Sequence, residues 1–296
     1  MLFTRYENNP IIKPESKNNF ETVGTFNPAA AVHNNKIYII YRALDNQNKS
    51  SLCLAISDDG YTFKKHPGNP IIQRSKSGHE KGGCEDPRIT KIGDTYYLLY
   101  TSYTGKRPVT PDTINESMAT SHDMVHWKKQ GIIMKGEKSA ALYHEKIEGK
   151  YVMFIGGLNI RVATSSNLKN WKLEEKPILK VRKDKFDSKF VEVGPPPFKF
   201  EDKLVLFFNT TNNKSVFQLS LALLKNSCKV VYRAEKPLMK PVTPYEKFGL
   251  IKNVIFATGL VEWKEQYFLY YGGADTTINV ATVSKKKMEQ YLSSLL

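Results

Sequence analysis

The residue types needed for acid–base chemistry occur in two segments that lie far apart in the sequence: Glu85-Asp86-Pro87-Arg88, and Glu192 shortly before a Gly-Pro-Pro-Pro run. Proline biases the residue before it toward extended geometry, which would hold Asp86 in a defined direction. Two carboxyl groups across a sugar-sized cleft can cleave a glycoside, because one donates a proton to the leaving oxygen and the other activates water. Two structural alternatives stay open. Asp86 and Arg88 could form a buried ion pair between adjacent sheets, and Glu192 could lie on the surface.

Arg88 raises a specific difficulty for this chemistry. In an extended segment Asp86 and Arg88 share a face, and Glu85 points the other way. A nearby guanidinium lowers the pKa of a carboxyl group, whereas a general acid works best with a raised pKa.

No motif for a competing chemistry is present. The sequence lacks a Walker phosphate loop, a dinucleotide-binding glycine fingerprint and a His-Glu-x-x-His zinc motif. His122 and His126 fall in a predicted turn and are expected to be exposed. Cys53, Cys84 and Cys228 do not have metal-binding spacing. We therefore predict no metal, no cofactor, and reduced thiols in a cytoplasmic protein.

The composition is that of an ordinary globular protein. The 296 residues are 41% hydrophobic and 25% charged, and no apolar stretch or N-terminal signal segment stands out. The formal net charge of +15 is spread as lysines through turns and strand starts. Because no Arg-rich stripe or long basic helix concentrates this charge, we predict neither a nucleic-acid nor a membrane partner. The charge could also attract anionic ligands, and a homo-oligomer is compatible with the sequence.

The elements that must position these residues are indicated by a pattern that returns five times. Each copy opens with an alternating aromatic and aliphatic run and continues into an alanine-centred strand. The runs begin at residues 36, 95, 150, 203 and 266, a period of 53 to 63 residues. A repeat of this length with several short strands is typical of a propeller. We predict an all-β fold, a five-bladed β-propeller that forms a single catalytic domain over residues 1–296.

The N-terminal strand is predicted to close the ring. Four repeats end in a segment such as Asn69-Pro70-Ile71-Ile72, whereas the fifth continues into a predicted short C-terminal helix over Ser284–Leu292. The missing segment occurs at the N-terminus as Asn9-Pro10-Ile11-Ile12. Because propeller sheets leave exposed edges unless the first and last blades share strands, residues 9–12 are expected to complete the fifth blade. The alternative is a coincidental recurrence of Pro-Ile pairs.

The segments that enter the five inner strands should converge on one mouth of the central channel. Their spacing repeats the blade period, so their polar side chains would face a shared cavity. This position favours functional roles for Asp86 and Glu192 over the structural alternatives. The five segments are Phe26–Ala29, Glu85–Arg88, Lys138–Ala140, Val191–Pro195 and Asn253–Phe256.

Taken in order, the motifs resemble glycoside hydrolase family 130, which comprises β-mannoside phosphorylases and β-1,2-mannosidases on five-bladed propellers. The resemblance implies an inverting mechanism with Asp86 as the general acid and a mannose-containing oligosaccharide as substrate. In the family's phosphorylases the proton passes through a hydroxyl of the bound mannose, which would let Asp86 act from a distance. The motifs lie between about residue 8 and residue 283: Phe26–Ala29, Tyr41–Ala43, Gly83–Ile89, Glu192–Pro196, Tyr245–Phe256 and Tyr270–Asp275.

The resemblance also implies substrate-binding residues around the two carboxyl groups. Asn27, Arg42, Asp45 and Asp275 match positions expected to hold the mannosyl unit at the cleaved end. The other predicted substrate-binding residues are Glu85, Arg88, Lys138, Asn209 and Tyr245.

The family's two activities predict different residues around the nucleophile. Its phosphorylases typically carry His-Arg after the third inner strand and His after the fourth, whereas the corresponding positions here are Ile155-Gly156 and Asn209. A carboxylate in place of those cations repels phosphate. We therefore predict an inverting β-mannosidase that acts on β-1,2-linked mannooligosaccharides, in which Asp86 donates the proton and Glu192 activates water.

Two alternatives stay open. A β-mannoside phosphorylase would use inorganic phosphate as co-substrate and release mannose 1-phosphate, and a non-catalytic propeller would bind sugars or serve as an interaction scaffold. Several cationic side chains could form a phosphate site from other positions. They are Lys138, His144, Arg161, Arg182 and Lys189.

Overall fold

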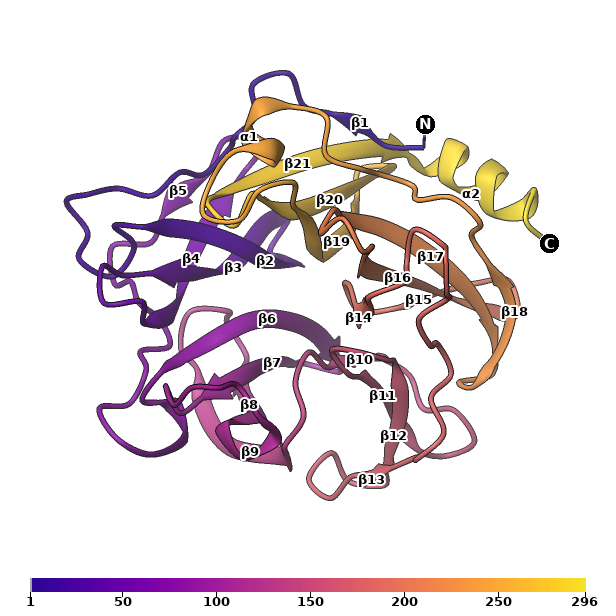
Figure 1. The fold of residues 1–296 in the computed structure, drawn as a ribbon, viewed down its shortest axis with the longest axis horizontal. Helices are drawn as coiled ribbons and strands as arrows, with labels where there is room; N and C mark the ends of the chain where they lie inside the picture. Colours follow the sequence, from indigo (N-terminus) through magenta and orange to yellow (C-terminus); the bar gives the residue numbers. More distant parts are fainter. Residues whose placement is uncertain (1) are drawn as a thin grey trace.

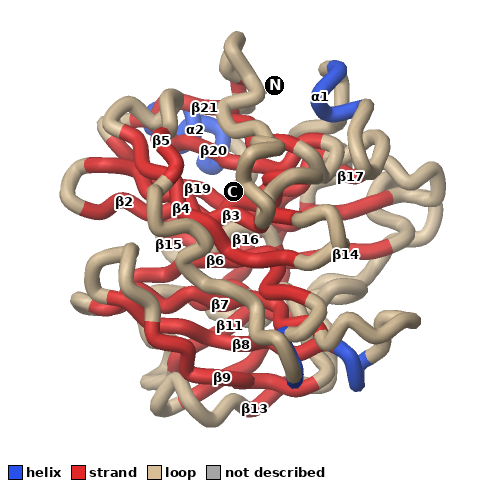
Figure 2. Tube along the Cα trace, turned by 90° about the vertical axis from the view of Figure 1, so that its left-hand side faces the viewer, coloured by secondary structure: helices blue, strands red, loops and turns tan. Residues whose placement is uncertain are grey.

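The regular secondary structure of the protein consists almost entirely of short β-strands in a computed structural model that describes residues 2–296. Figure 1 shows the sheets side by side around a common centre, and Figure 2 shows strands through most of the depth of the molecule. The described residues contain two α-helices, α1 (Pro244–Lys247) and α2 (Lys285–Ser293), and two single turns of 3-10 helix, Gly78–Glu80 and Pro111–Thr113. The prediction of a predominantly β fold with a short C-terminal helix is confirmed. No helix in this part of the chain is long and apolar enough to cross a membrane.

The largest sheet joins two antiparallel groups of strands. It runs in the order β2-β3-β4-β6-β7-β8-β9, with β5 beside β4, and the two groups meet where Ser50 pairs in parallel with Gly83. Its strands are β2 (Gly24–His33), β3 (Lys36–Leu44), β4 (Ser50–Ser57), β5 (Lys64–Lys65), β6 (Gly83–Ile92), β7 (Thr95–Tyr103), β8 (Ile114–Ser121) and β9 (Lys128–Lys135).

Three smaller sheets complete the described structure. The first contains β10 (Ala141–Leu142), β11 (Tyr151–Ile155), β12 (Arg161–Ser165) and β13 (Lys172–Leu173). The second contains β14 (Phe190–Val193), β15 (Phe198–Phe200), β16 (Lys203–Thr211), β17 (Phe217–Lys225) and β18 (Lys229–Arg233). The third contains β1 (Thr4–Arg5), β21 (Thr277–Ser284), β20 (Gln266–Gly273) and β19 (Ile255–Trp263) in that order. None of these sheets closes on itself among the described strands, and the number of blades stays a prediction.

Apolar side chains fill the spaces between neighbouring sheets. Phe207 of β16, Leu221 of β17 and Leu269 of β20 belong to one buried cluster, although they come from two sheets. Burying a side chain of this size contributes about 1.5–3 kcal/mol. This packing fixes the strands that carry the polar residues described below.

The N-terminus joins the sheet that ends the chain. Strand β1 pairs with β21, and Ile12 forms a bridge with Ile278, while Phe3 is 1% exposed. The segment predicted to join this sheet, residues 9–12, contributes the single bridge of Ile12, whereas the paired strand lies outside it at Thr4–Arg5. Helix α2 follows β21 directly, and the Ser284 side chain accepts the N–H of Lys287 to cap it, as expected for a serine at this position.

The predicted closing segments of the other repeats form single bridges in three cases, whereas the segment of the second repeat lies within β9. Proline lacks the N–H that a strand ladder needs, so a Pro-containing segment pairs through fewer hydrogen bonds. The bridges join Leu52 to Ile72, Ile160 to Leu179 and Leu219 to Met239.

Candidate active site

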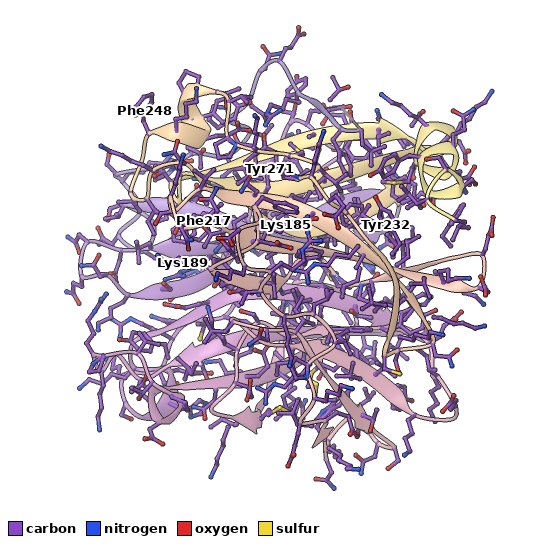
Figure 3. The ribbon with its side chains drawn as sticks, turned by 45° about the vertical axis from the view of Figure 1, so that its right-hand side comes forward. Lys185, Lys189, Phe217, Tyr232, Phe248 and Tyr271 are labelled. Atoms are coloured by element: carbon purple, nitrogen blue, oxygen red, sulfur yellow. The ribbon has the colours of Figure 1, made fainter. Side chains whose placement is uncertain are left out.

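A cavity of about 820 Å³ opens where β2 and β6 begin. Its volume is within the range of small-molecule sites. Lys189 and Phe217, labelled in Figure 3, also line it. One residue from each of the five segments predicted to converge lines this cavity: Asn27, Asp86, Lys138, Glu192 and Phe256.

Asn27 and Asp86 occupy equivalent bulges near the starts of β2 and β6. The strand register shifts between Phe26 and Ala29 and again between Glu85 and Arg88. Both residues have left-handed backbone angles, with φ of 48° and 51°. Asn and Asp adopt this conformation more readily than other non-glycine residues. The bulge interrupts the regular alternation of side chains between the two faces of the strand, which the sequence predicts for Asp86 and its neighbours.

The Asp86 carboxylate is held by two donors. Its Oδ1 accepts hydrogen bonds from Asn27 Nδ2 at 2.8 Å and from Arg42 Nη1 at 3.2 Å. Burial raises the pKa of this carboxyl group, but the positive charges of Arg42, Arg88 and Lys138 outweigh burial and hold the pKa below its ordinary value. These charges favour the carboxylate form of Asp86.

Glu85 shares the guanidinium of Arg42 with Asp86. Arg42 Nη2 donates to Glu85 Oε1 at 2.8 Å, and Ser50 Oγ donates to the same oxygen at 3.4 Å. Burial raises the pKa of Glu85. The predicted opposite orientation of Glu85 and Asp86 is wrong in this respect, because both carboxyl groups reach one arginine.

Glu192, the second predicted carboxylate, is 2% exposed. Its Oε1 accepts a hydrogen bond from Ser139 Oγ at 2.6 Å, and its Oε2 accepts one from Lys138 Nζ at 3.1 Å. The charge of Glu192 raises the pKa of Lys138 in return. Glu192 therefore does not occupy the surface position that the sequence left open.

Arg88 links the two acidic segments through the backbone. Its Nη1 donates to the carbonyl of Asp86 at 2.9 Å, and its Nη2 donates to the carbonyl of Val193 at 2.5 Å. Nη2 also lies 3.6 Å from Glu192 Oε1. The ion pair considered for Asp86 and Arg88 is thus replaced by pairing of Asp86 with Arg42, while Arg88 joins β6 to β14.

Asp275 lines the same cavity from the turn between β20 and β21. Its carboxyl group makes no hydrogen bond with another described residue. Burial raises its pKa to about 7, and the nearby carboxyl groups of Asp86, Glu192 and Glu85 act in the same direction against the charge of Arg42.

Five predicted substrate-binding residues do not line the cavity: Glu85 and Arg88, described above, and three that are engaged elsewhere. Asp45 Oδ1 accepts the backbone N–H groups of residues 47 and 49 in the turn after β3. The Asn209 side chain exchanges two hydrogen bonds of 2.8 Å with the backbone of Ala257, which ties β16 to β19. Tyr245 lies in α1, where its hydroxyl accepts a hydrogen bond from Asn9.

The five cationic side chains that could form an anion site lie in different parts of the structure, and only three of them line the cavity. Lys138, Arg161 and Lys189 line the cavity, and Arg161 is paired with Glu137, which also lines it. Arg182 instead pairs with the buried carboxylate of Asp187. The remaining candidate, His144, lines a separate, smaller cavity.

Sequence reasoning did not identify Ser139, Glu137 or Phe217 as individual functional residues. Ser139 lies within one of the converging segments, so its position could have indicated it, whereas no motif indicates Glu137 or Phe217. No group of three or more His, Cys, Asp or Glu side chains placed to hold a metal occurs within residues 2–296.

Fold and site together define a predominantly β protein with two fixed carboxyl groups in one cavity, an arrangement suited to glycoside cleavage. The family model described as β-1,4-mannooligosaccharide phosphorylase, that of glycoside hydrolase family 130, matches residues 4–293. Since this match covers nearly the whole sequence, the chain belongs to glycoside hydrolase family 130.

Relatives with both activities resemble the chain over almost its full length. A 1,2-β-oligomannan phosphorylase of Thermoanaerobacter is 35% identical over 96% of this chain and 98% of its own. A β-1,2-mannobiose phosphorylase of the same organism is 36% identical over 97% and 98%. One solved structure has a TM-score of 0.88 and 28% identity over 96% of this chain and 94% of its own. Its description says that the GH130 family of mannoside phosphorylases contains glycoside hydrolases that target β-1,2 mannosidic linkages in Candida mannan.

Proposed function

We propose that the protein cleaves β-1,2-linked mannosides by displacement at the anomeric carbon, with Asp86 delivering the proton to the leaving oxygen. The observation that carries this proposal is the presence of Asp86, fixed by Asn27 and Arg42, in one cavity with Glu192. The names of the relatives support the substrate class.

The names of the relatives favour inorganic phosphate as the acceptor of the mannosyl group. The two curated relatives at 35% and 36% identity are named phosphorylases, which favours phosphorolysis over the hydrolysis preferred from the sequence. Lys138, Arg161 and Lys189 supply positive charge to the cavity. In this reaction a phosphate oxygen bonds to the anomeric carbon, the glycosidic bond breaks, the leaving oxygen takes up the proton, and mannose 1-phosphate is released.

Hydrolysis is the second candidate, and the ion pairs of the cavity favour it. Arg42, Lys138 and Arg161 are each paired with a carboxylate, so Lys189 is the cavity-lining cation that forms no ion pair with a described residue. Phosphate carries close to two negative charges and would have to compete with these carboxylates. Glu192 would then activate water.

Incubation with β-1,2-mannobiose in the presence and absence of inorganic phosphate tests the proposal. We expect turnover to depend on phosphate and mannose 1-phosphate to be the product, identified by chromatography and ³¹P NMR. Free mannose formed at the same rate without phosphate would overturn phosphorolysis and establish the second candidate. Cleavage of neither this substrate nor longer β-1,2-mannooligosaccharides would overturn the proposed substrate class.

The variant Asp86→Asn tests the proton donor. The amide preserves the shape of the side chain but cannot deliver the proton, so kcat/KM for β-1,2-mannobiose should fall by about 10²–10⁴-fold. Circular dichroism should show an unchanged fold. A near-normal rate in this variant would remove Asp86 from the mechanism.

A further inference from the structure

Two aromatic side chains line the cavity without taking part in the chemistry proposed above. They are Phe190 of β14 and Phe217 of β17. Both side chains are only half-buried, whereas Phe256, which also lines the cavity, is 7% exposed. Aromatic surface that is left open in a cavity is where the apolar part of a ligand packs.

The alternation of side chains along β14 places Phe190 on the same face as Glu192. Val191 between them belongs to the apolar cluster between neighbouring sheets, whereas Phe190 and Glu192 line the cavity. Exposure increases from Glu192, which is 2% exposed, through Phe190 to the exposed Lys189. Phe190 therefore lies nearer the mouth of the cavity than Glu192, by two residues or about 6.6 Å of strand.

Strand pairing brings Phe217 beside Phe190. Thr211 of β16 pairs with both residues, so the three side chains form one row on one face of the sheet. The ring centroids of Phe190 and Phe217 are 5.5 Å apart, and the ring planes are inclined by 62°. The N–H of Phe217 donates to the carbonyl of Asn253 at 2.9 Å, which fixes the start of β17. These two rings form a preorganised apolar surface, the aromatic platform.

A sugar chain is the ligand that matches both the aromatic platform and the carboxyl groups. The face of a sugar ring carries C–H groups that pack on an aromatic ring, while the hydroxyl groups at its edge bind polar side chains. In the proposed function the mannosyl unit at the cleaved end lies deep in the cavity with Asp86, so the leaving group extends toward the mouth. The row that carries the platform spans three strands, about 9.5 Å, which is more than one sugar unit covers.

We propose that the aromatic platform binds sugar units of the leaving group and selects chains of three or more mannose units over the disaccharide. This inference rests on the proposed function, which sets the direction of the chain in the cavity. Binding energy from units remote from the reacting bond can be used at that bond, so longer chains should also have a higher kcat/KM.

Calorimetric titration in the Asp86→Asn background tests the aromatic platform, because this variant should bind a sugar chain without cleaving it. β-1,2-Mannotriose should bind at least ~10-fold more tightly than β-1,2-mannobiose, and Phe217→Ala should reduce this preference to about 2-fold or less. Phe217→Tyr, which keeps the ring, should retain the preference. Mannose alone occupies only the deep end, so Phe217→Ala should leave its affinity unchanged.

The matched control is Phe248→Ala. Phe248, labelled with Phe217 in Figure 3, is 69% exposed and does not line the cavity, so its removal should change none of these affinities. An unchanged preference for mannotriose in Phe217→Ala, or an equal loss of affinity for mannose, would overturn the proposal. Phe190→Ala provides the same comparison if circular dichroism shows that Phe217→Ala does not fold.

The binding measurement separates this inference from the proposed function. A protein that binds mannotriose through Phe217 but cleaves no β-1,2-mannoside would contradict the proposed function and leave the aromatic platform supported. A protein that cleaves these substrates with the same chain-length preference in the wild type and in Phe217→Ala would contradict the aromatic platform alone.

Discussion

At the scale of single residues, the carboxyl groups of the cavity differ in their neighbours more than in their chemistry. Arg42 and Asn27 hold the Asp86 carboxylate, and Lys138 and Ser139 hold that of Glu192 by hydrogen bonds. Asp275 lacks such partners. Acids whose environments push their pKa values apart take different roles in a reaction.

The contact between Glu192 and Lys138 predicts how the acceptor is bound. If phosphate is the acceptor, Glu192→Gln releases Lys138 for the anion, and the KM for phosphate should fall several-fold. Steady-state kinetics with varied phosphate measure this. Glu175→Gln, which removes a cavity-lining charge that has no ion pair among the described residues, is the matched control and should change this KM less. A loss of all turnover in Glu192→Gln, with and without phosphate, would instead indicate the base of a hydrolase.

Six of the predicted site residues line the cavity, and the sequence motifs were sufficient to identify them: Asn27, Arg42, Asp86, Lys138, Glu192 and Asp275. The motif around Asp45 could not reveal that its carboxylate is already used by a turn, because that depends on the local backbone. The contact of Asn209 could not be predicted for a similar reason, since its partner Ala257 is distant in sequence. Glu116 has no motif, and only its electrostatic interaction with Arg88 relates this residue of β8 to the site.

At the scale of elements, the strands were predicted well because the aromatic and aliphatic runs repeat with a fixed period. The bulges in β2 and β6 were not predicted. The bulges depend on how each strand pairs with its neighbour. From the sequence alone, an X-Pro dipeptide such as Asn27-Pro28 or Asp86-Pro87 predicts only a turn or an extended segment.

The polar turns that follow the alanine-centred strands share one hydrogen-bonding scheme. In the first repeat Asp59 Oδ1 accepts the N–H groups of Tyr61 and Thr62 at 2.8 and 2.7 Å. In the third repeat Asn167 Oδ1 accepts those of Lys169 and Asn170, each at 3.0 Å. A neutral amide can therefore replace the carboxylate in such a turn.

This comparison gives a prediction for Asp59→Asn. Burial raises the pKa of Asp59, but its hydrogen bonds from Thr62, Tyr61 and Ser57 outweigh burial and lower the pKa from 3.8 to about 2. A lowered folded-state pKa means that the carboxylate stabilises the fold above about pH 4 and that this contribution is lost as the pH falls through about 2. Because Asp59 is exposed, we expect Asp59→Asn to cost about 1 kcal/mol or less at neutral pH.

Urea unfolding of the wild type and Asp59→Asn at several pH values measures this difference. The gap between the two unfolding free energies should shrink as the pH approaches about 2. Asn167→Ala should destabilise the protein by an amount that does not change with pH in this range. A constant gap for Asp59→Asn would show that the ionised form of Asp59 contributes nothing.

At the scale of the whole molecule, part of the excess positive charge has a structural role. Lysines occur on the outer strands of the sheets, where unpaired backbone groups face the surroundings. A lysine on an edge strand opposes pairing with another chain. The strands concerned are β5 (Lys64–Lys65), β9 (Lys128–Lys135), β13 (Lys172–Leu173) and β18 (Lys229–Arg233).

The N-terminal segment should contribute strongly to the stability of the whole protein. Phe3 is buried against Phe207, with ring centroids 6.0 Å apart, in the cluster between the last two sheets. Phe3→Ala should lower the free energy of unfolding by about 3–5 kcal/mol. Urea unfolding measures this, with Glu7→Ala as an exposed control in the same segment. A midpoint like that of the control would show that the N-terminal segment is not needed for the fold.

The pairing of β1 with β21 also has a consequence for biosynthesis. The sheet of β19, β20 and β21 takes its outer strand from β1, which is synthesised before every other described strand, whereas β21 is synthesised after all of them. Figure 1 shows β1 beside β21, which leads into α2. Until β21 has been synthesised, Thr4 and Arg5 have no strand to join, so the nascent chain must carry an unpaired N-terminal segment while all the other described strands are made.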